Sequence, residues 1–129
     1  VGQEAPKVDI ESVVKAVGVK EENIRVIDPY KLDETKEAVK AAYEADELFV
    51  IIAEQPCALI KEVQRARKGI HCKINQEKCR KCKVCLRVGC PAISFNGEIV
   101  AIDETQCNGC TICQQVCPFD SIEYYEERR

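Results

Sequence analysis

Apolar residues in the first part of the chain recur first at helical spacing and then as a short run. Valines at helical spacing predict a helix over residues 10–16, and Asp9 stands where its N-cap is expected. The apolar run at 24–27 predicts a strand. Asp28-Pro29 then predicts a turn that ends this strand.

The same order of elements follows once more. Behind Asp33, alanines, a valine and a tyrosine at helical spacing predict a second helix at about 34–45, capped by Asp33. Residues 48–54 are nearly all apolar, as in a parallel strand that is covered on both faces. Strand, helix and strand at this spacing predict one right-handed βαβ crossover. So small a sheet leaves one face exposed, so we expect a parent domain or a partner to cover it. A self-sufficient small α/β cap is the alternative.

The second part of the chain contains an internal repeat. NQEKCRKC at 75–82 matches DETQCNGC at 103–110 with an offset of 28 residues, and CPAISF matches CPFDSI further on. Two related halves with a pseudo-two-fold relationship are expected, and Asn96-Gly97 predicts a hairpin between them. The predicted strands are Ile74 with 93–95 in one half and 99–102 with 122–124 in the other, and the predicted short helices are 85–88 and 113–116.

Eight of the ten cysteines fall in two runs, CRKCKVCLRVGCP at 79–91 and CNGCTICQQVCP at 107–118. The spacing C-x2-C-x2-C puts three thiolates around one loop, within reach of three corners of a [4Fe–4S] cube. In two-cluster ferredoxins the cysteine ahead of the proline ligates the other cluster. Cluster I would therefore take Cys79, Cys82, Cys85 and Cys117. Cluster II would take Cys107, Cys110, Cys113 and Cys90.

Other uses of these cysteines fit the spacing less well. Structural zinc usually has two well-separated C-x2-C pairs, often with histidine, whereas these triplets are unbroken and His71 is the only histidine. A disulfide framework needs an oxidising compartment and normally a secretory signal, and residues 1–10 contain no apolar segment of that kind. A structural zinc-binding adaptor stays as the third hypothesis for the chain.

Length and charge narrow the class of protein. The 129 residues suffice for one or two small domains. No apolar run approaches the roughly 20 residues that cross a bilayer. The net charge of −3 argues against a nucleic-acid backbone as the main partner. We therefore expect a soluble, cytoplasmic protein with no membrane and no nucleic-acid partner.

Charge is distributed unevenly over the two cysteine runs. The first run is crowded by five bases, Lys78, Arg80, Lys81, Lys83 and Arg87. Residues 104–117 contain Glu104 and no base. Nearby cations favour the more negative, reduced form of a cluster, so cluster I is expected to have the higher potential. The same basic rim could dock an acidic acceptor, or these side chains could be solvated and only balance the cluster charge.

Three segments ahead of the cysteines carry a more specific likeness. They are PKVDIESVVKAVGV, RVIDPYKLDETKEAVKAAYEA and LFVIIAEQPCALI. Together with the run ending GCPAI, they resemble the C-terminal part of the alpha subunit of indolepyruvate ferredoxin oxidoreductase, from about Ala5 to Tyr124. The resemblance implies the tail of a thiamine-diphosphate-binding domain with a two-cluster ferredoxin domain fused behind it. It also implies oxidative decarboxylation of aryl pyruvates to acyl-CoA, with the electrons passed to an external ferredoxin.

The chain departs from this family at three points. No GDG-type stretch that binds metal and diphosphate occurs, so thiamine diphosphate and Mg are expected only in the parent enzyme, and no residue here is expected to be catalytic. Glu54-Gln55 stand where the family usually has basic residues, and four residues rather than three separate Cys85 from Cys90. We therefore expect a fragment, or one subunit of a divided enzyme.

The expected architecture is α+β, with a partial α/β (βαβ) segment at 1–66 followed by a ferredoxin-like two-[4Fe–4S] domain at 67–129. The leading hypothesis is an electron relay in a 2-oxoacid:ferredoxin oxidoreductase, inactive by itself. Its expected partners are the remainder of its subunit, a second (beta) subunit and an external acidic ferredoxin. The alternative is a free-standing two-cluster ferredoxin whose N-terminal extension docks a partner.

Several residues outside the motifs have simpler expectations. Cys57 and Cys72 are expected to be buried as small hydrophobes, with a spare ligand for a damaged cluster as the alternative. His71 is expected at the surface, with acid–base work as the alternative. Residues 58–67 are expected to form a basic helix or connector, and Tyr124-Tyr125 to take part in a strand and the core.

Overall fold

The computed structural model describes residues 6–127, which fall into two compact units. The first unit ends at Gln55 and the second begins at Pro56, so residues 56–66 group with the cysteine-rich part. Residues 1–5, part of the stretch that argued against a secretory signal, lie outside the described residues. Within the described part of the chain, no helix is both long and apolar enough to cross a membrane.

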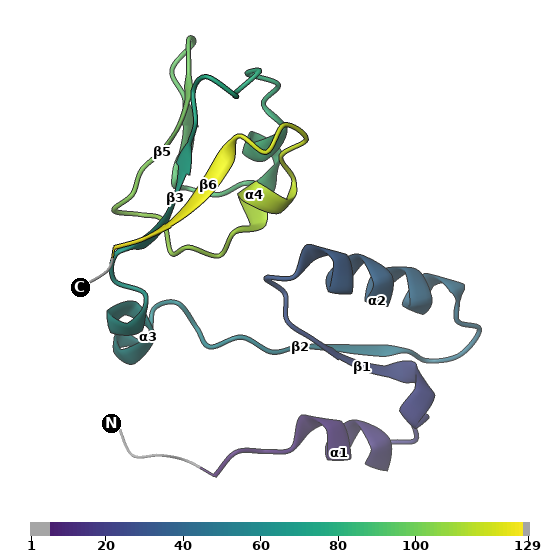
Figure 1. Cartoon of the computed structure of the whole chain (residues 1–129). Coiled ribbons are helices and arrows are strands. Elements are labelled where there is room, and N and C mark those ends of the chain that lie inside the picture. The colour runs from purple at the N-terminus through teal and green to yellow at the C-terminus, as the bar shows by residue number, and fades with distance from the viewer. Residues whose placement is uncertain (1–5, 128–129) are drawn as a thin grey trace. The chain divides into compact units, whose positions relative to one another are not determined.

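The first unit is a pair of parallel strands between two helices. Its elements are α1 (Ile10–Ala16), the 3₁₀ helix η1 (Glu21–Asn23), β1 (Ile24–Ile27), α2 (Leu32–Glu44) and β2 (Val50–Ala53). The strands pair from Ile24 opposite Val50 to Ile27 opposite Ala53, and α2 connects them along the chain. Figure 1 shows α1 and α2 on opposite sides of the strands.

The two helices of this unit begin differently. The Asp9 carboxylate accepts a hydrogen bond from the amide of Ser12 at 3.1 Å, which confirms the predicted N-cap of α1. The predicted cap of α2 is wrong. Lys31 occupies the N-cap position without a side-chain hydrogen bond, and Asp33 lies inside the first turn. A carboxylate there still favours the helix because it faces the positive end of the helix dipole.

The core of the first unit is small. Val14 of α1 packs on a cluster of Val19, Ile24 and Ile52, and Ala38 of α2 is buried. Many apolar side chains stay exposed, namely Val8, Ile10, Val13, Val17, Val26, Val39, Tyr43 and Leu48. A contiguous apolar surface of this kind is typical of an interface.

The second unit carries all the cysteines and consists of short elements. They are α3 (Lys61–Ala66), β3 (Ile70–Ile74), the 3₁₀ helix η2 (Val84–Val88), β4 (Ile93–Phe95), β5 (Val100–Ile102), α4 (Ile112–Gln115) and β6 (Ile122–Glu126). The core contains Cys72, Cys85, Ile93, Val100, Cys113 and Ile122. Cysteines therefore occupy half of the buried core, and the chain folds around its own thiols.

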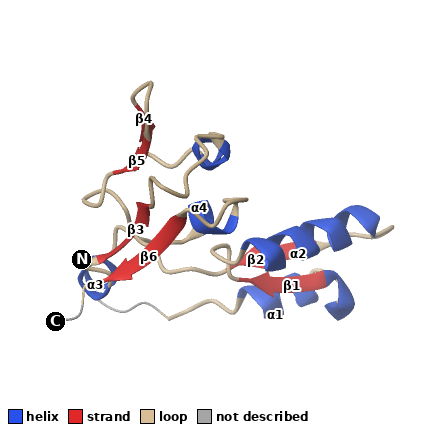
Figure 2. Ribbon diagram, turned by 45° about the horizontal axis from the view of Figure 1, so that its top comes forward, coloured by secondary structure: helices blue, strands red, loops and turns tan. Residues whose placement is uncertain are grey.

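The strand pairs of the second unit join the two halves of the repeat (Figure 2). β3 pairs antiparallel with β6, and β4 pairs antiparallel with β5, so the strands assigned to each half do not pair with each other. The β4–β5 hairpin at Asn96-Gly97 is present as predicted. The Asn96 side chain accepts hydrogen bonds from the amides of Glu98 and Ile99, at 3.0 and 2.9 Å, and fixes this turn.

Candidate iron–sulfur site

Four cysteines line a single small cavity in the second unit. They are Cys79, Cys82, Cys85 and Cys117, the set expected for cluster I. Cys85 is buried, Cys79 and Cys117 are partly buried, and Cys82 is exposed. Burial raises the pKa of the Cys85 thiol, and the charges of the three neighbouring thiols raise it further. The fold thus brings one cysteine of the second run to three of the first.

The other four cysteines also approach one another. Cys113 is buried, and Cys90, Cys107 and Cys110 are partly buried. Burial raises the pKa of the Cys110 thiol, and its neighbours Cys90 and Cys107 raise it further. A hydrogen bond with Cys72 and burial raise the pKa of Cys113, which also lies near Cys107 and Cys110. A fifth thiol, that of Cys72, therefore stands beside the second set.

The donor type and the surroundings of both sets suit iron–sulfur ligation. Thiolates are the ligands of such clusters, and an apolar lining limits the access of water. The apolar lining of the first cavity comprises Ile74, Val84, Val100, Phe119 and Ile122. Within residues 6–127, no three ligating side chains converge closely enough to hold one metal ion. A cube of four irons holds its thiolates farther apart than one zinc ion does, with its sulfurs about 2.3 Å away, so this spacing is compatible with a cluster.

Two groups that are not expected ligands donate or share hydrogen bonds with cysteine sulfurs. The backbone amide of Cys72 donates to Sγ of Cys107 at 3.3 Å. The Ser121 hydroxyl lies 3.1 Å from Sγ of Cys117. Burial opposes ionisation of Cys117, but the hydrogen bonds from Ser121 and from backbone amides lower the pKa of its thiol overall. The sequence interpretation missed Ser121. Its only signal was a serine directly before Ile122, where the first half has Ala92 before its isoleucine.

Two of the five bases in the first run are held by other side chains. Lys78 forms an ion pair with Glu123 at 3.0 Å. The ammonium of Lys83 lies 4.0 Å from the ring centre of Phe95, a cation–π contact. The remaining three bases, Arg80, Lys81 and Arg87, are exposed, and their side chains have no hydrogen bond or ion pair with any residue the structure describes. These three flank the exposed cysteine of the first set.

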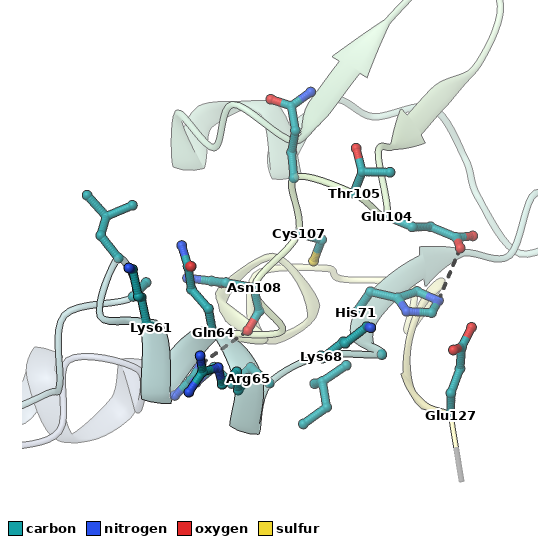
Figure 3. A pocket seen from close by; sticks show the side chains of 16 residues that line it. Lys61, Gln64, Arg65, Lys68, His71, Glu104, Thr105, Cys107, Asn108 and Glu127 are labelled. Carbon is teal, nitrogen blue, oxygen red and sulfur yellow. Dashed lines mark hydrogen bonds and ion pairs between the residues drawn. The ribbon is translucent and has the colours of Figure 1, made fainter. Parts of the chain in front are cut away.

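Bases also reach the second run, from segments that are distant in the sequence. Arg67 donates to the carbonyl oxygen of Asn108 at 3.1 Å, and Lys73 pairs with Glu104 at 2.9 Å. An open cavity of about 950 Å³ lies beside Cys107, between α3 and this loop (Figure 3). Its basic lining comprises Lys61, Arg65, Arg67 and Lys68. The second run lacks bases along the sequence only, so the charge difference between the two sets is smaller than the sequence indicates.

The residues outside the motifs show where local reasoning failed. Cys72 is fully buried, as predicted, but Cys57 is exposed in the segment between β2 and α3. The predicted surface position of His71 is wrong, because its ring is buried, stacks on Tyr125 and faces Glu104 at 3.5 Å. Tyr124 and Tyr125 lie on β6 as expected but are more than two-fifths exposed, so they are not core residues.

Comparison with known proteins agrees with these observations. A family model for a 4Fe-4S binding domain matches residues 100–123, which include all four cysteines of the second run. The chain is 39% identical over 94% of its length to indolepyruvate oxidoreductase subunit IorA of Thermococcus kodakarensis. It is 40% and 38% identical over 92% of its length to the subunits of the same name from Pyrococcus abyssi and Pyrococcus horikoshii. No solved structure matches the chain significantly.

These relatives are much longer proteins. The matched region is 19% of each of these three subunits, so the chain spans about a fifth of their length. The similarity covers both the α/β unit and the cysteine-rich unit, and it confirms the resemblance that the sequence indicated. The chain carries a 4Fe-4S binding domain and is homologous, over nearly all of its length, to a segment of indolepyruvate oxidoreductase subunit IorA.

Proposed function

We propose that this chain is the electron relay of a 2-oxoacid:ferredoxin oxidoreductase that acts on indolepyruvate or related aryl pyruvates. In this role it passes electrons from a thiamine-bound intermediate through two [4Fe–4S] clusters to an external ferredoxin. The observation that carries the proposal is a pair of four-cysteine sets, within one compact unit, in a homologue of IorA. A cluster supplies one-electron redox chemistry when bound, and the protein supplies ligands, burial and hydrogen bonds.

The ligand sets that we propose are crossed between the runs. Cluster I takes Cys79, Cys82, Cys85 and Cys117, and cluster II takes Cys107, Cys110, Cys113 and Cys90. Support for the first set comes from the shared cavity. Support for the second comes from the proximity of Cys90 to Cys110. The homology supports iron and sulfide rather than zinc as the inorganic partner.

We also propose that residues 67–129 are built from two halves related by a pseudo-two-fold axis. The 28-residue offset relates the pair β3–β6 to the pair β5–β4. Equivalent backbone hydrogen bonds support this relation. The amide of Asn75 donates to Ser121 at 2.7 Å, and the amide of Asp103 donates to Ala92 at 2.8 Å. Lys83 and Thr111, 28 residues apart, both adopt the left-handed conformation, with φ of 63° and 62°.

The first unit is proposed to be the tail of a thiamine-diphosphate domain with a βαβ crossover. The exposed stripe of Val39 and Tyr43 on α2, flanked by Lys36 and Lys40, supports a covering surface in the remainder of the parent subunit. A second (beta) subunit completes the proposed enzyme. A reducing compartment such as the cytoplasm suits its thiolates. The separate chain is then inactive toward 2-oxoacids.

The acceptor is proposed to dock where cluster I comes closest to solvent. Of the eight cysteines, Cys82 alone is exposed, and Arg80 and Lys81 precede it with side chains open to solvent. An acidic ferredoxin would be attracted to these charges, and this attraction weakens as salt rises.

Rapid anaerobic mixing of the assembled parent enzyme with indolepyruvate and coenzyme A tests the proposed function. Bleaching of the iron–sulfur absorbance before external ferredoxin is added is the expected result. The control omits the 2-oxoacid. Substrate turnover that leaves the clusters of this chain oxidised, in the absence of acceptor, would contradict a relay.

A further inference from the structure

Ser121 is a buried polar residue at a position where the repeat otherwise uses an apolar one. Its side chain is 3% exposed, and it directly precedes the buried Ile122. A buried hydroxyl needs a hydrogen-bond partner, because leaving it without one costs on the order of 1–3 kcal/mol. The partner that the structure gives this hydroxyl is Sγ of Cys117, at 3.1 Å.

The direction of this hydrogen bond follows from the chemistry of ligation. A cysteine bound to iron is a thiolate and has no proton to donate. The sulfur of Cys117 can then only accept, so the Ser121 hydroxyl is the donor. An O–H donor to a charged sulfur is a charge-assisted hydrogen bond, which is stronger than a bond between neutral groups.

The other half of the repeat lacks this donor. Ala92 accepts the amide of Asp103 through its carbonyl at 2.8 Å, as Ser121 accepts the amide of Asn75 at 2.7 Å. Ala92 is 2% exposed and directly precedes the buried Ile93. The two positions are therefore equivalent in backbone role and burial, and only one of them carries a hydroxyl.

We propose that Ser121 is a positioning residue that raises the reduction potential of the cluster ligated by Cys117, and that Ala92 leaves the other cluster without an equivalent donor. This inference rests on the crossed ligand sets proposed above. Reduction adds negative charge to the cluster and its thiolates, so a donor that stabilises this charge favours the reduced form. The hydroxyl thus makes the two clusters unequal at a residue that is not itself a ligand.

A purely structural role predicts something different. If Ser121 only fills space, replacing its hydroxyl by hydrogen changes packing and stability and leaves both potentials where they are. If the hydrogen bond tunes the cluster, the potential of one cluster moves and that of the other does not. The midpoint potential therefore separates the two roles, whereas thermal stability alone does not.

The test compares Ser121→Ala, Ser121→Thr and Ala92→Ser in the anaerobically prepared full chain. Both midpoint potentials are measured by redox titration followed by electron paramagnetic resonance, and thermal unfolding is recorded alongside. Ser121→Ala should lower one of the two potentials, and Ser121→Thr, which keeps the hydroxyl, should restore it. Ala92→Ser adds a buried hydroxyl to the other half and should leave the potential of the Cys117-ligated cluster unchanged.

The outcomes separate this inference from the proposed function. Iron and sulfide content of the unchanged chain is measured first, and absence of clusters there contradicts the proposed function itself. With both clusters present, equal potentials in Ser121→Ala and the unchanged chain overturn the role of Ser121. If Ser121→Ala fails to retain its cluster, Ser121→Thr decides, because a tuning hydroxyl predicts an unshifted potential in that variant.

Discussion

Gly109 packs directly against Ile70, so that a Cβ on Gly109 would clash with Cγ2 of that side chain. Gly109 also has a φ of 67°, in the left-handed region, and it follows the loop residue that Arg67 contacts. The repeat position 28 residues earlier is Lys81, with a φ of 54°. The backbone conformation alone thus tolerates a side chain there, and the contact with Ile70 is what requires glycine.

Gly109→Ala should therefore destabilise the second unit far more than Gly89→Ala. Both glycines have positive φ, but nothing lies within 4 Å of a Cβ on Gly89. The matched pair shares the backbone cost of about 1 kcal/mol, and the clash adds about 1–3 kcal/mol at Gly109 only. Chemical denaturation of the two variants measures the difference. Equal loss of stability would mean that Ile70 does not restrain this loop.

Cys90→Ser should remove cluster II although Cys90 lies in the first run. The reason is the crossed ligation, in which Cys90 completes the set of Cys107, Cys110 and Cys113. The variant should retain about half of its iron and sulfide. Cys57→Ser is the control, because Cys57 is the exposed cysteine outside both runs, and it should retain all of them.

The identity of the lost cluster decides this test. Potentiometry should show that the remaining potential is the one that responds to Ser121→Ala. Selective loss of that responsive cluster would refute the crossed assignment. Cys72 could replace the missing ligand, so Cys90→Ser is repeated with Cys72→Ser. Iron that falls only in the double variant identifies Cys72 as a spare ligand.

Removing two exposed charges beside Cys82 should slow electron transfer to an acidic ferredoxin. Arg80→Gln with Lys81→Gln weakens long-range attraction, which acts over a Debye length of about 10 Å at 0.1 M salt. The expected result is a lower rate at low salt and a flatter salt dependence. Lys61→Gln with Arg65→Gln removes the same charge beside Cys107. A larger effect from that second pair would place the docking surface at the α3 cavity instead.

Polar substitution of the exposed stripe on α2 should disrupt assembly without unfolding the chain. Tyr43 is 91% exposed, so Val39→Ser with Tyr43→Ser should change the free energy of unfolding of the isolated chain by no more than about 0.5 kcal/mol per site. Association with the remainder of the parent enzyme, followed by gel filtration, should be lost. Ala38→Leu is the contrasting control, because Ala38 is buried and overpacking there costs about 1–3 kcal/mol. Unimpaired assembly of the double variant would exclude the stripe as the covered surface.

Local signals in the sequence predicted the features that neighbouring residues determine. Asp9 caps α1 because its carboxylate reaches an amide three residues away. Asn96 fixes the β4–β5 turn in the same local way. The cysteine spacing likewise identified both sets of thiols, because a loop of a few residues determines where three of each set can lie.

Contacts between distant segments account for what the sequence did not predict. The pairing of β3 with β6, the approach of Arg67 to Asn108 and the seat of Lys83 on Phe95 depend on the complete fold. His71 is buried because β6 brings Tyr125 over its ring. Ser121 shows its role only when Cys117 is seen beside it, since a serine near a motif carries no signal of its own.

Metal and acid-labile sulfide analysis of the anaerobically purified chain tests the central claim most directly. Two complete sets of four cysteines predict about eight iron and about eight sulfide per chain, with the electron paramagnetic resonance signals of two interacting [4Fe–4S] clusters on reduction. Stoichiometric zinc without sulfide, persisting after anaerobic reconstitution with iron and sulfide, would contradict the account and leave a structural zinc protein in its place.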